Sequence, residues 1–253
     1  MPIKRNMKES RELFVEEYAG RLYPNVSEGL FYENDAGRLL LGDCMDVMQS
    51  LEEGSVDMIF ADPPYNIGKS RDWDCWSSME EYIEWTERWV RAASRILKPD
   101  GTMYVCGFSE IIALCQAPAM KYFASCKWTI WSYRNKANLS NDWGRSHEAI
   151  LCFRKGKRFT FNVDDVRVPY NAHTMKYPQR TQGETSQYAR EGRQGRAWQP
   201  NPKGAKPRDV IDLPTTCNGM NEKTDHPTQK PEELVRKYIL ASSNEGDLVF
   251  DPF

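Results

Sequence analysis

The sequence predicts an α/β domain: a mostly parallel central sheet with helices on both faces and one antiparallel hairpin. Three observations predict it. Short apolar runs of strand length alternate with amphipathic segments of helix length. Two later runs, rich in β-branched and aromatic residues, are separated only by a polar loop, as in a hairpin. The chain has 253 residues, 40% of them hydrophobic, which is enough to bury a sizeable core.

The N-terminal quarter is predicted to hold an arm and then a strand, a helix and a second strand. Residues 1–37 form the arm, irregular or helical, with one short amphipathic helix in "SRELFVEEYAGRL". Residues 38–43 are an apolar run closed by Gly-Asp, which predicts a buried strand. The next segment predicts a helix that ends at Gly54, and the apolar run 56–61 predicts another buried strand.

The clearest helix is predicted over residues 79–97, where apolar residues recur at spacings of three and four. Ser78 and Glu81 form a capping box at its start. The segment "LKPDG" then predicts a turn into a strand at 102–107, and "FSEIIALCQAPAM" predicts a further helix.

The second half of the chain completes this pattern. Residues 127–133 and 148–155 predict the two strands of the hairpin. Residues 230–243 predict a helix with Pro231 in its first turn and acidic residues after it. Residues 247–253 predict a last strand.

Residues 156–225 interrupt the alternation, because their strand and helix signals are weak. A loop of this length in a compact domain is usually functional or disordered. From residue 154 to residue 208 there are 13 Lys and Arg against 4 Asp and Glu, although the whole chain has a net charge of −2. Such a basic segment in an acidic body is typical of a polyanion-binding protein, and a solvated basic loop is the alternative.

Several classes of protein are disfavoured. No apolar run approaches the roughly 20 residues of a membrane span, so we expect no membrane partner and an intracellular protein. The seven cysteines include no CxxC pair, which favours reduced thiols over disulfides or a zinc site. We therefore expect no metal.

Aspartates follow three of the predicted strands, at Asp43, Asp62 and Asp251. Ligands bind outside the carboxyl ends of strands in open α/β sheets, so we expect the three carboxylates on one edge of the sheet. Carboxylates at strand ends can hold Mg²⁺, but the residues after Asp62 indicate another ligand.

The segment "DPPY" at residues 62–65 is suited to an aromatic amine. Pro63 and Pro64 lack N–H groups and present their carbonyls rigidly. A carboxylate beside a fixed carbonyl suits a group with two N–H donors, and Tyr65 offers a flat face for stacking on an aromatic ring. A simple strand-terminating turn is the alternative.

Together with other segments, this motif resembles the β-class DNA amino-methyltransferases, which methylate exocyclic nitrogens of DNA bases with S-adenosyl-L-methionine. The other segments are "LLLGDCMDVMQSL", "RILKPDGTMYV", "TIWSYRNK", "SHEAILCFRKGK", "HPTQKP" and "FDPF". The resemblance covers residues 30–253 and implies a Rossmann-like methyltransferase fold. It implies a catalytic half at 38–155, a target-recognition insert at 156–225 and the start of the cofactor-binding half at 226–253.

The resemblance also implies site residues. Asp62 and the Pro63 carbonyl would accept hydrogen bonds from the target amine, Pro64 would stiffen the turn, and Tyr65 would stack on the base. The residues expected near the cofactor are Asp43, Cys44, Asp62, His226, Thr228, Lys230, Asp251 and Phe253. Lys230 would meet the methionine carboxylate and Asp251 its ammonium group; a helix-entry role for His226 and a solvated Lys230 are the alternatives.

DNA contacts are expected from the basic insert, since such enzymes flip the target base out of the duplex. The expected contacts are Arg180, Arg190, Arg193, Arg196, Lys203 and Lys206, with the aromatic residues Tyr170, Tyr177, Tyr188 and Trp198. Packing is the alternative role for these aromatic residues. Trp73 and Trp76 are expected to form a lid or, equally, a surface hydrophobic contact.

The predicted function is site-specific methylation of adenine N6 in double-stranded DNA, because aspartate in the first motif position is typical of adenine-specific members. A cytosine-N4 enzyme and a non-catalytic DNA-binding or regulatory subunit are alternatives, and RNA or a glutamine amide could also present an NH₂ group. A cognate restriction enzyme and a second copy of the chain are candidate partners. We expect a bacterial or phage-encoded protein of the cytoplasm, near the nucleoid.

In the family pattern a glycine-rich turn follows "DPF", whereas this sequence stops at Phe253. The expectation is a fragment that is cut within the cofactor motif and binds the cofactor weakly or not at all.

Overall fold

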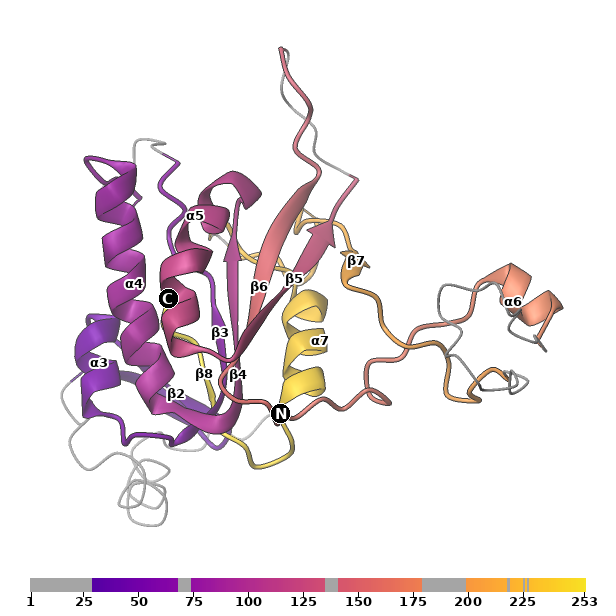
Figure 1. Cartoon of the computed structure of the whole chain (residues 1–253), viewed down its shortest axis with the longest axis horizontal. Coiled ribbons are helices and arrows are strands. Elements are labelled where there is room, and N and C mark those ends of the chain that lie inside the picture. Colours follow the sequence, from indigo (N-terminus) through magenta and orange to yellow (C-terminus); the bar gives the residue numbers. More distant parts are fainter. Residues whose placement is uncertain are drawn as a thin grey trace, which may run out of the picture.

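The computed structural model describes residues 29–67, 74–134, 141–178, 199–217, 219–224, 226 and 228–253. Six strands form one sheet in the order β7-β5-β6-β4-β3-β8 (Figure 1). They are β3 (Val56–Ala61), β4 (Leu97–Gly107), β5 (Ser125–Ser132), β6 (His147–Arg154), β7 (Val210–Asp212) and β8 (Val249–Phe250). Only β6 runs antiparallel to its neighbours β4 and β5, so the predicted mostly parallel sheet with one hairpin is confirmed.

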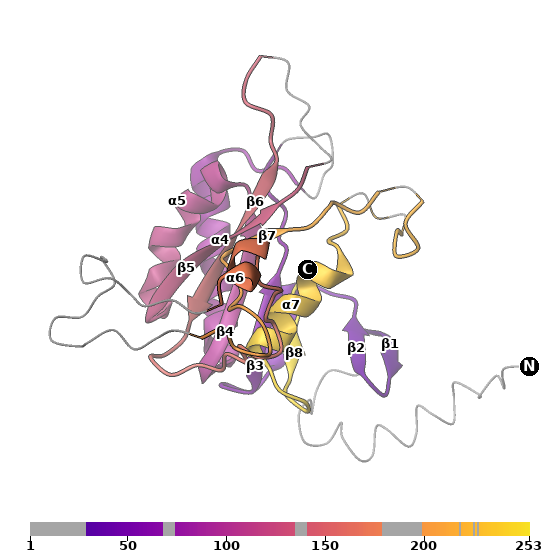
Figure 2. The same cartoon turned by 90° about the vertical axis from the view of Figure 1, so that its right-hand side faces the viewer.

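Helices cover both faces of the sheet, as the sequence predicts (Figures 1 and 2). On one face lie α3 (Cys44–Ser50), α4 (Met79–Ile96) and α5 (Ser109–Ala119), and on the other lies α7 (Glu232–Ser242). Strand β3 shows the alternation: Ile59 packs in the α4 core, while Met58 packs in the α7 core. No helix among the described residues is both long and apolar enough to cross a membrane.

The helix predicted at 79–97 is confirmed as α4. The Ser78 hydroxyl accepts a hydrogen bond from the Glu81 backbone N–H at 3.1 Å and so caps the first turn. Trp89 on its inner face is fully buried. The helices predicted at 108–120 and 230–243 are confirmed as α5 and α7, and Pro231 is the N-cap residue of α7.

The strand predicted at 38–43 is present only over residues 38–40, and the prediction that it is buried is wrong. Strands β1 (Leu30–Asn34) and β2 (Gly37–Leu40) form a separate two-stranded ribbon, in which Leu39 is 55% exposed. The cause is local, because the Asn34 side chain accepts hydrogen bonds from the backbone N–H groups of Ala36 and Gly37. This asparagine turn pairs the segment with the residues just before it.

The turn predicted at "LKPDG" lies within β4, which is assigned from Leu97. Val56 lies opposite Leu97 and Met58 lies opposite Thr102, so residues 98–101 bulge out of the β3–β4 ladder. Pairing with β6 also starts at Thr102, so the turn and the strand predicted at 102–107 are confirmed. Pro99 lies in this bulge, where its missing N–H breaks no regular pairing. Gly101 is required by close packing: a Cβ atom there would lie 2.9 Å from the Asp57 carbonyl oxygen.

The region 156–225 contains more structure than its sequence indicates. Strand β7 pairs in parallel with β5 at the sheet edge, and α6 (Ala172–Lys176) lies on an arm that projects away from the sheet (Figure 1). A three-residue strand and a five-residue helix are too short to give a periodic signal.

Helix α7 is held to the sheet by Leu234, which is fully buried. We expect Leu234→Ala to lower the free energy of unfolding by about 3 kcal/mol, because it leaves a cavity in the core. Leu114→Ala, at a position 49% exposed on α5, is the matched control and should change it by less than about 0.5 kcal/mol. Urea unfolding followed by circular dichroism checks both; equal costs would contradict the described packing of α7.

Candidate active site

One edge of the sheet collects the ends of several strands. Asp62 follows β3 and Asp251 follows β8, and these two strands pair in parallel, with Ile59 opposite Phe250. Strand β4 ends at the same edge, where Gly107 pairs with Ala149 of the antiparallel β6. The first residues of β6, including Glu148, therefore lie here too. We call this edge the strand-end rim.

Four side chains make a compact charge cluster on this rim: Asp62, Tyr65, Glu148 and Lys230. The Lys230 Nζ atom lies 2.8 Å from Asp62 Oδ2 and 3.5 Å from Glu148 Oε2. The Tyr65 hydroxyl oxygen lies 2.8 Å from Asp62 Oδ1 and 2.9 Å from Glu148 Oε2. The side chains of Lys230, Glu148 and Asp62 are 10%, 13% and 24% exposed, so the cluster borders solvent but is largely shielded from it.

The electrostatics follow from this crowding. Burial alone would lower the pKa of Lys230, but the carboxylates of Asp62 and Glu148 raise it above its ordinary value. Burial, with the Asp62 charge, holds the pKa of Tyr65 well above its ordinary value, so the phenol stays protonated. Burial at the strand ends raises the pKa of Asp251 to about 6, and the Asp62 charge adds to this shift.

The turn at residues 62–65, which we call the motif turn, is held in place by Tyr82 of α4. Its hydroxyl donates a hydrogen bond to the Pro64 carbonyl at 2.7 Å. Trp76 packs edge-on against Tyr82, with ring centroids 4.9 Å apart. The structure therefore gives Trp76 a packing contact with α4, the second of its two predicted roles; Trp73 lies outside the described residues.

The end of the motif turn is held by Asp74, a buried carboxylate. It accepts hydrogen bonds from the backbone N–H groups of Asn66 at 2.5 Å and Ile67 at 3.4 Å. Asn66 has a positive φ of 56°, a conformation that asparagine tolerates better than most residues. Asp74 is 4% exposed, so its contacts are shielded from water.

We expect Asp74→Ala to lower the free energy of unfolding by about 2 kcal/mol, because the charged acceptor of two backbone N–H groups is lost. Asp142→Ala is the matched control, since the Asp142 side chain is exposed and, within the described part of the chain, accepts only from the next residue's N–H. Chemical denaturation of both variants tests this; a cost at Asp74 no larger than at Asp142 would contradict it.

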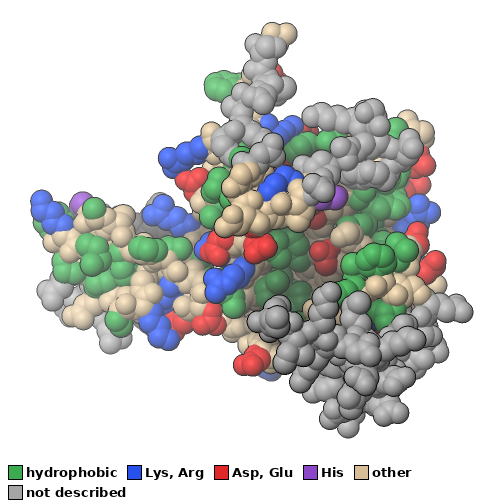
Figure 3. Space-filling view, turned by 180° about the vertical axis from the view of Figure 1, so that it is seen from behind, with side chains coloured by type: hydrophobic (Ala, Val, Ile, Leu, Met, Phe, Trp, Pro, Cys, Tyr) green, Lys and Arg blue, Asp and Glu red, His purple; other side chains and the backbone are tan. Residues whose placement is uncertain are grey.

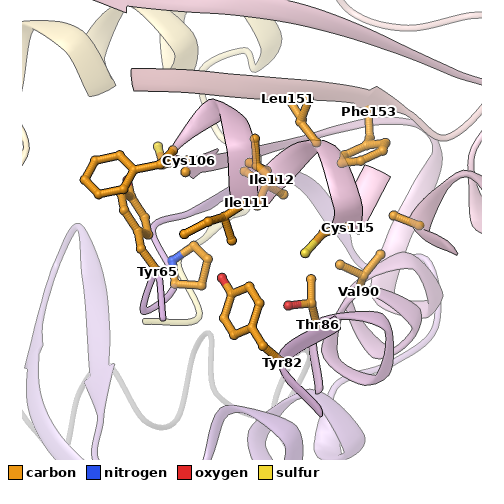
Figure 4. A pocket seen from close by; sticks show the side chains of 15 residues that line it. Tyr65, Tyr82, Thr86, Val90, Cys106, Ile111, Ile112, Cys115, Leu151 and Phe153 are labelled. Atoms are coloured by element: carbon orange, nitrogen blue, oxygen red, sulfur yellow. The ribbon is translucent and has the colours of Figure 1, made fainter. Parts of the chain in front are cut away.

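A small cavity lies beside the turn, between α4, α5 and the sheet (Figure 4). Tyr65 and Tyr82 line it on the side of the turn, and Leu151 and Phe153 line the far side. Its volume is about 10 Å³, which is room for about one water molecule. It is therefore part of the packed core and far too small for a nucleobase.

The structure shows the local contacts of the other predicted cofactor residues. Asp43 does not follow a strand of the six-stranded sheet, so that part of the prediction is wrong; it caps α3 by accepting from the Met45 N–H at 2.7 Å. Its role near the cofactor stays a prediction. Cys44 packs beside Asp43, and burial raises the pKa of its thiol to about 11. His226 and Thr228 are both exposed, and the Thr228 Oγ1 atom lies 3.4 Å from His226 Nδ1.

Phe253 packs against two tryptophans of α4. Its ring centroid is 5.8 Å from that of Trp85 and 5.2 Å from that of Trp89. This contact places the end of the "FDPF" segment over α4, beside the rim.

The expected DNA contacts lie on the projecting arm or outside the described residues. Those outside are Arg180, Tyr188, Arg190, Arg193, Arg196 and Trp198. Lys203 pairs with Asp164 at 2.8 Å, and Lys206 is exposed. Tyr170 accepts a hydrogen bond from the Asn201 N–H, whereas Tyr177 is 51% exposed. Figure 3 shows Lys and Arg side chains along this arm, at the left of the view.

Three residues of the site are not predicted from the sequence: Asp74, Tyr82 and Glu148. Tyr82 occupies an ordinary apolar position of the α4 pattern, and Asp74 lies in a loop without periodicity. The place of Glu148 on the rim was predictable, because the first residues of a strand antiparallel to β4 must lie at the carboxyl end of β4.

Comparisons with known proteins show the family of this chain. A family model described as DNA methylase matches residues 56–253. The type II methyltransferase M.HpaI of Haemophilus parainfluenzae is 34% identical over 222 residues, which are 85% of this chain and 63% of that protein. The chain thus spans less than two thirds of that relative. The DNA adenine methyltransferase YhdJ of Escherichia coli is 34% identical over 226 residues, 88% of this chain and 72% of that protein.

Solved structures share the fold at lower identity. The PvuII DNA methyltransferase, described as cytosine-N4-specific, gives a TM-score of 0.64 at 14% identity, over 90% of this chain and 77% of that one. TTHA0409 of Thermus thermophilus, a putative DNA modification methylase complexed with S-adenosyl-L-methionine, gives a TM-score of 0.50 at 20% identity. The match covers 84% of this chain and 76% of that one. At these identities the likeness concerns the fold alone.

Proposed function

This chain belongs to the DNA methylase family, and from that membership we propose that it methylates N6 of adenine in double-stranded DNA with S-adenosyl-L-methionine. The observation that carries the proposal is the motif turn at residues 62–65, placed on the strand-end rim beside Lys230. Adenine is favoured because Asp62 occupies the first motif position and because the relative YhdJ is named an adenine methyltransferase.

The residues of the rim fit the proposed cofactor. S-adenosyl-L-methionine supplies a methyl group on a positively charged sulfur, and its amino-acid end carries one carboxylate and one ammonium group. Lys230 and Asp251 offer the opposite charges. Lys230 lies 2.8 Å from Asp62, and Asp251 follows β8, the strand paired with the one that Asp62 follows, so both belong to the rim. Asp43, Cys44, His226, Thr228 and Phe253 remain proposed contacts by the family pattern.

The motif turn would orient the target amine. The Pro64 carbonyl is occupied by the Tyr82 hydroxyl, whereas none of the described residues donates a hydrogen bond to the Pro63 carbonyl. The Pro63 carbonyl and the Asp62 carboxylate can therefore accept the two N–H groups of the amine, which turns its lone pair out of the ring plane toward the methyl group. Tyr65 would stack on the flipped base. Positioning and electrostatics supply the catalysis.

The projecting arm would hold the DNA backbone. Lys203 and Lys206, with the arginines of the same insert, would contact phosphates, and such contacts fix the register of a protein on DNA without reading its sequence. A cognate restriction enzyme and a homodimer stay predictions of the same proposal. Its substrate would place the protein with the DNA in the cytoplasm of a bacterial cell.

The proposal is tested by sequencing the modified bases in DNA from cells that express the full protein, and by digesting that DNA to nucleosides. We expect N6-methyladenine within one short recognition sequence. Detection of N4-methylcytosine would show that cytosine, and not adenine, is the target base. DNA that is bound but never methylated would favour the non-catalytic subunit, and methylated RNA or glutamine would contradict the proposed substrate.

A further inference from the structure

The charge cluster has fewer donors than its two carboxylates can accept. A phenol hydroxyl carries one hydrogen, yet the Tyr65 oxygen lies within 2.9 Å of both Asp62 and Glu148. At any moment the hydroxyl donates to only one of them. Lys230 is likewise shared, at 2.8 Å from Asp62 and 3.5 Å from Glu148.

In this arrangement each oxygen of Asp62 already accepts from one donor. Its Oδ1 atom faces the Tyr65 hydroxyl and its Oδ2 atom faces the Lys230 ammonium. A target amine must donate to one of these oxygens if Asp62 orients it as proposed above. A carboxylate offers about four acceptor sites, so the amine can join the present donors, but an Asp62 oxygen that releases the phenol or the ammonium attracts the amine more strongly.

Glu148 is the nearest place for a released donor. Its Oε2 atom already lies within hydrogen-bonding distance of the Tyr65 hydroxyl, and the two distances from Lys230 Nζ differ by less than an ångström. Among the described residues, no other donor forms a hydrogen bond with its carboxylate. Glu148 is also fixed in place, because it opens β6 just before the fully buried Ala149 and Ile150.

We propose that Glu148 is a positioning residue that takes over the Tyr65 hydroxyl and the Lys230 ammonium from Asp62 when the target amine binds. This inference rests on the function proposed above. The exchange does not leave the Lys230 ammonium unpaired, because it has a carboxylate partner before and after it.

Glu148→Gln tests the inference, because it keeps the shape of the side chain and removes its charge. We expect the single-turnover rate of methyl transfer to fall on the order of 10- to 100-fold, as for a lost hydrogen bond to a charged group. The affinity for DNA should not change, because the substitution leaves the proposed DNA contacts on the arm as they are.

Glu87→Gln is the matched control. Glu87 also accepts hydrogen bonds from a lysine and a tyrosine, Lys121 at 2.8 Å and Tyr122 at 3.1 Å, but it lies on α4 away from the cluster. This variant should methylate DNA at the wild-type rate. Urea unfolding of both variants shows whether they fold alike.

Glu148→Asp separates charge from shape. It keeps the carboxylate at a shorter reach, so its rate should lie between those of the wild type and Glu148→Gln. The inference is overturned if Glu148→Gln works at the wild-type rate, if both substitutions cost the same, or if rate and DNA affinity fall together. A wild-type protein that binds DNA without methylating it would overturn the proposed function as well.

Discussion

Asp62→Ala is expected to lower the single-turnover rate of methyl transfer to DNA by about 1,000-fold, the size of effect seen when one preorganised electrostatic partner is removed. The reason is that the amine then keeps only the Pro63 carbonyl as an acceptor, and its lone pair is no longer held toward the methyl group. DNA affinity should be unchanged, since the residue lies on the strand-end rim and the proposed DNA contacts lie on the arm. The rate is measured on duplex DNA that contains the recognition sequence found in expressing cells.

The control for this prediction is Asp62→Asn. Asparagine keeps one acceptor oxygen but no charge, so a smaller loss is expected. The fold should tolerate both changes, because Lys230 can pair with Glu148 instead. An Asp62→Ala protein that methylates DNA at more than about a tenth of the wild-type rate would contradict the assigned role, since a tenfold change is only about 1.4 kcal/mol.

Lys230→Met is expected to have the largest effect on stability. It leaves Asp62 and Glu148 facing each other on a shielded rim without their cation. Breaking a buried ion pair in this way costs about 3 kcal/mol or more of unfolding free energy. Urea unfolding of the variant and of the wild type measures it.

Two further variants make this test specific. Lys121→Met removes the cation of an exposed pair with Glu87 and should cost less than about 1 kcal/mol. Adding Glu148→Gln to Lys230→Met should restore part of the lost stability, since one of the two unpaired charges is removed. A Lys230 variant that costs no more than the Lys121 variant would show that Lys230 is not the counter-ion of the cluster.

The main sheet and its helices could be predicted from the sequence where the pattern is long or the run fully apolar. Helix α4 has 18 residues with an apolar face and a capping serine, and β3 is buried along nearly its whole length. The failure at residues 38–43 is local, because the ribbon β1–β2 depends on one asparagine turn, which leaves no periodic signal.

The site could be predicted in part. The ends of adjacent parallel strands meet, so Asp62 and Asp251 were predictable neighbours. The sequence did not show that the strand before Asp43 lies outside the six-stranded sheet, because an apolar run does not say which sheet it joins. Glu148 required the direction of β6, which the hairpin prediction contained. Asp74 reaches the motif turn through a loop whose path no sequence pattern encodes.

Photo-crosslinking at the target base tests the central claim most directly. The claim is that residues 62–65 hold the amine of a flipped base, with Tyr65 against its ring. A duplex that carries 5-iodouracil in place of the target base is irradiated on the full protein, and the attached peptide is identified by mass spectrometry. The account predicts attachment to Tyr65, lost when the iodouracil is moved one position along the strand. Attachment to a residue away from the strand-end rim, by a duplex that is bound with normal affinity, would contradict it.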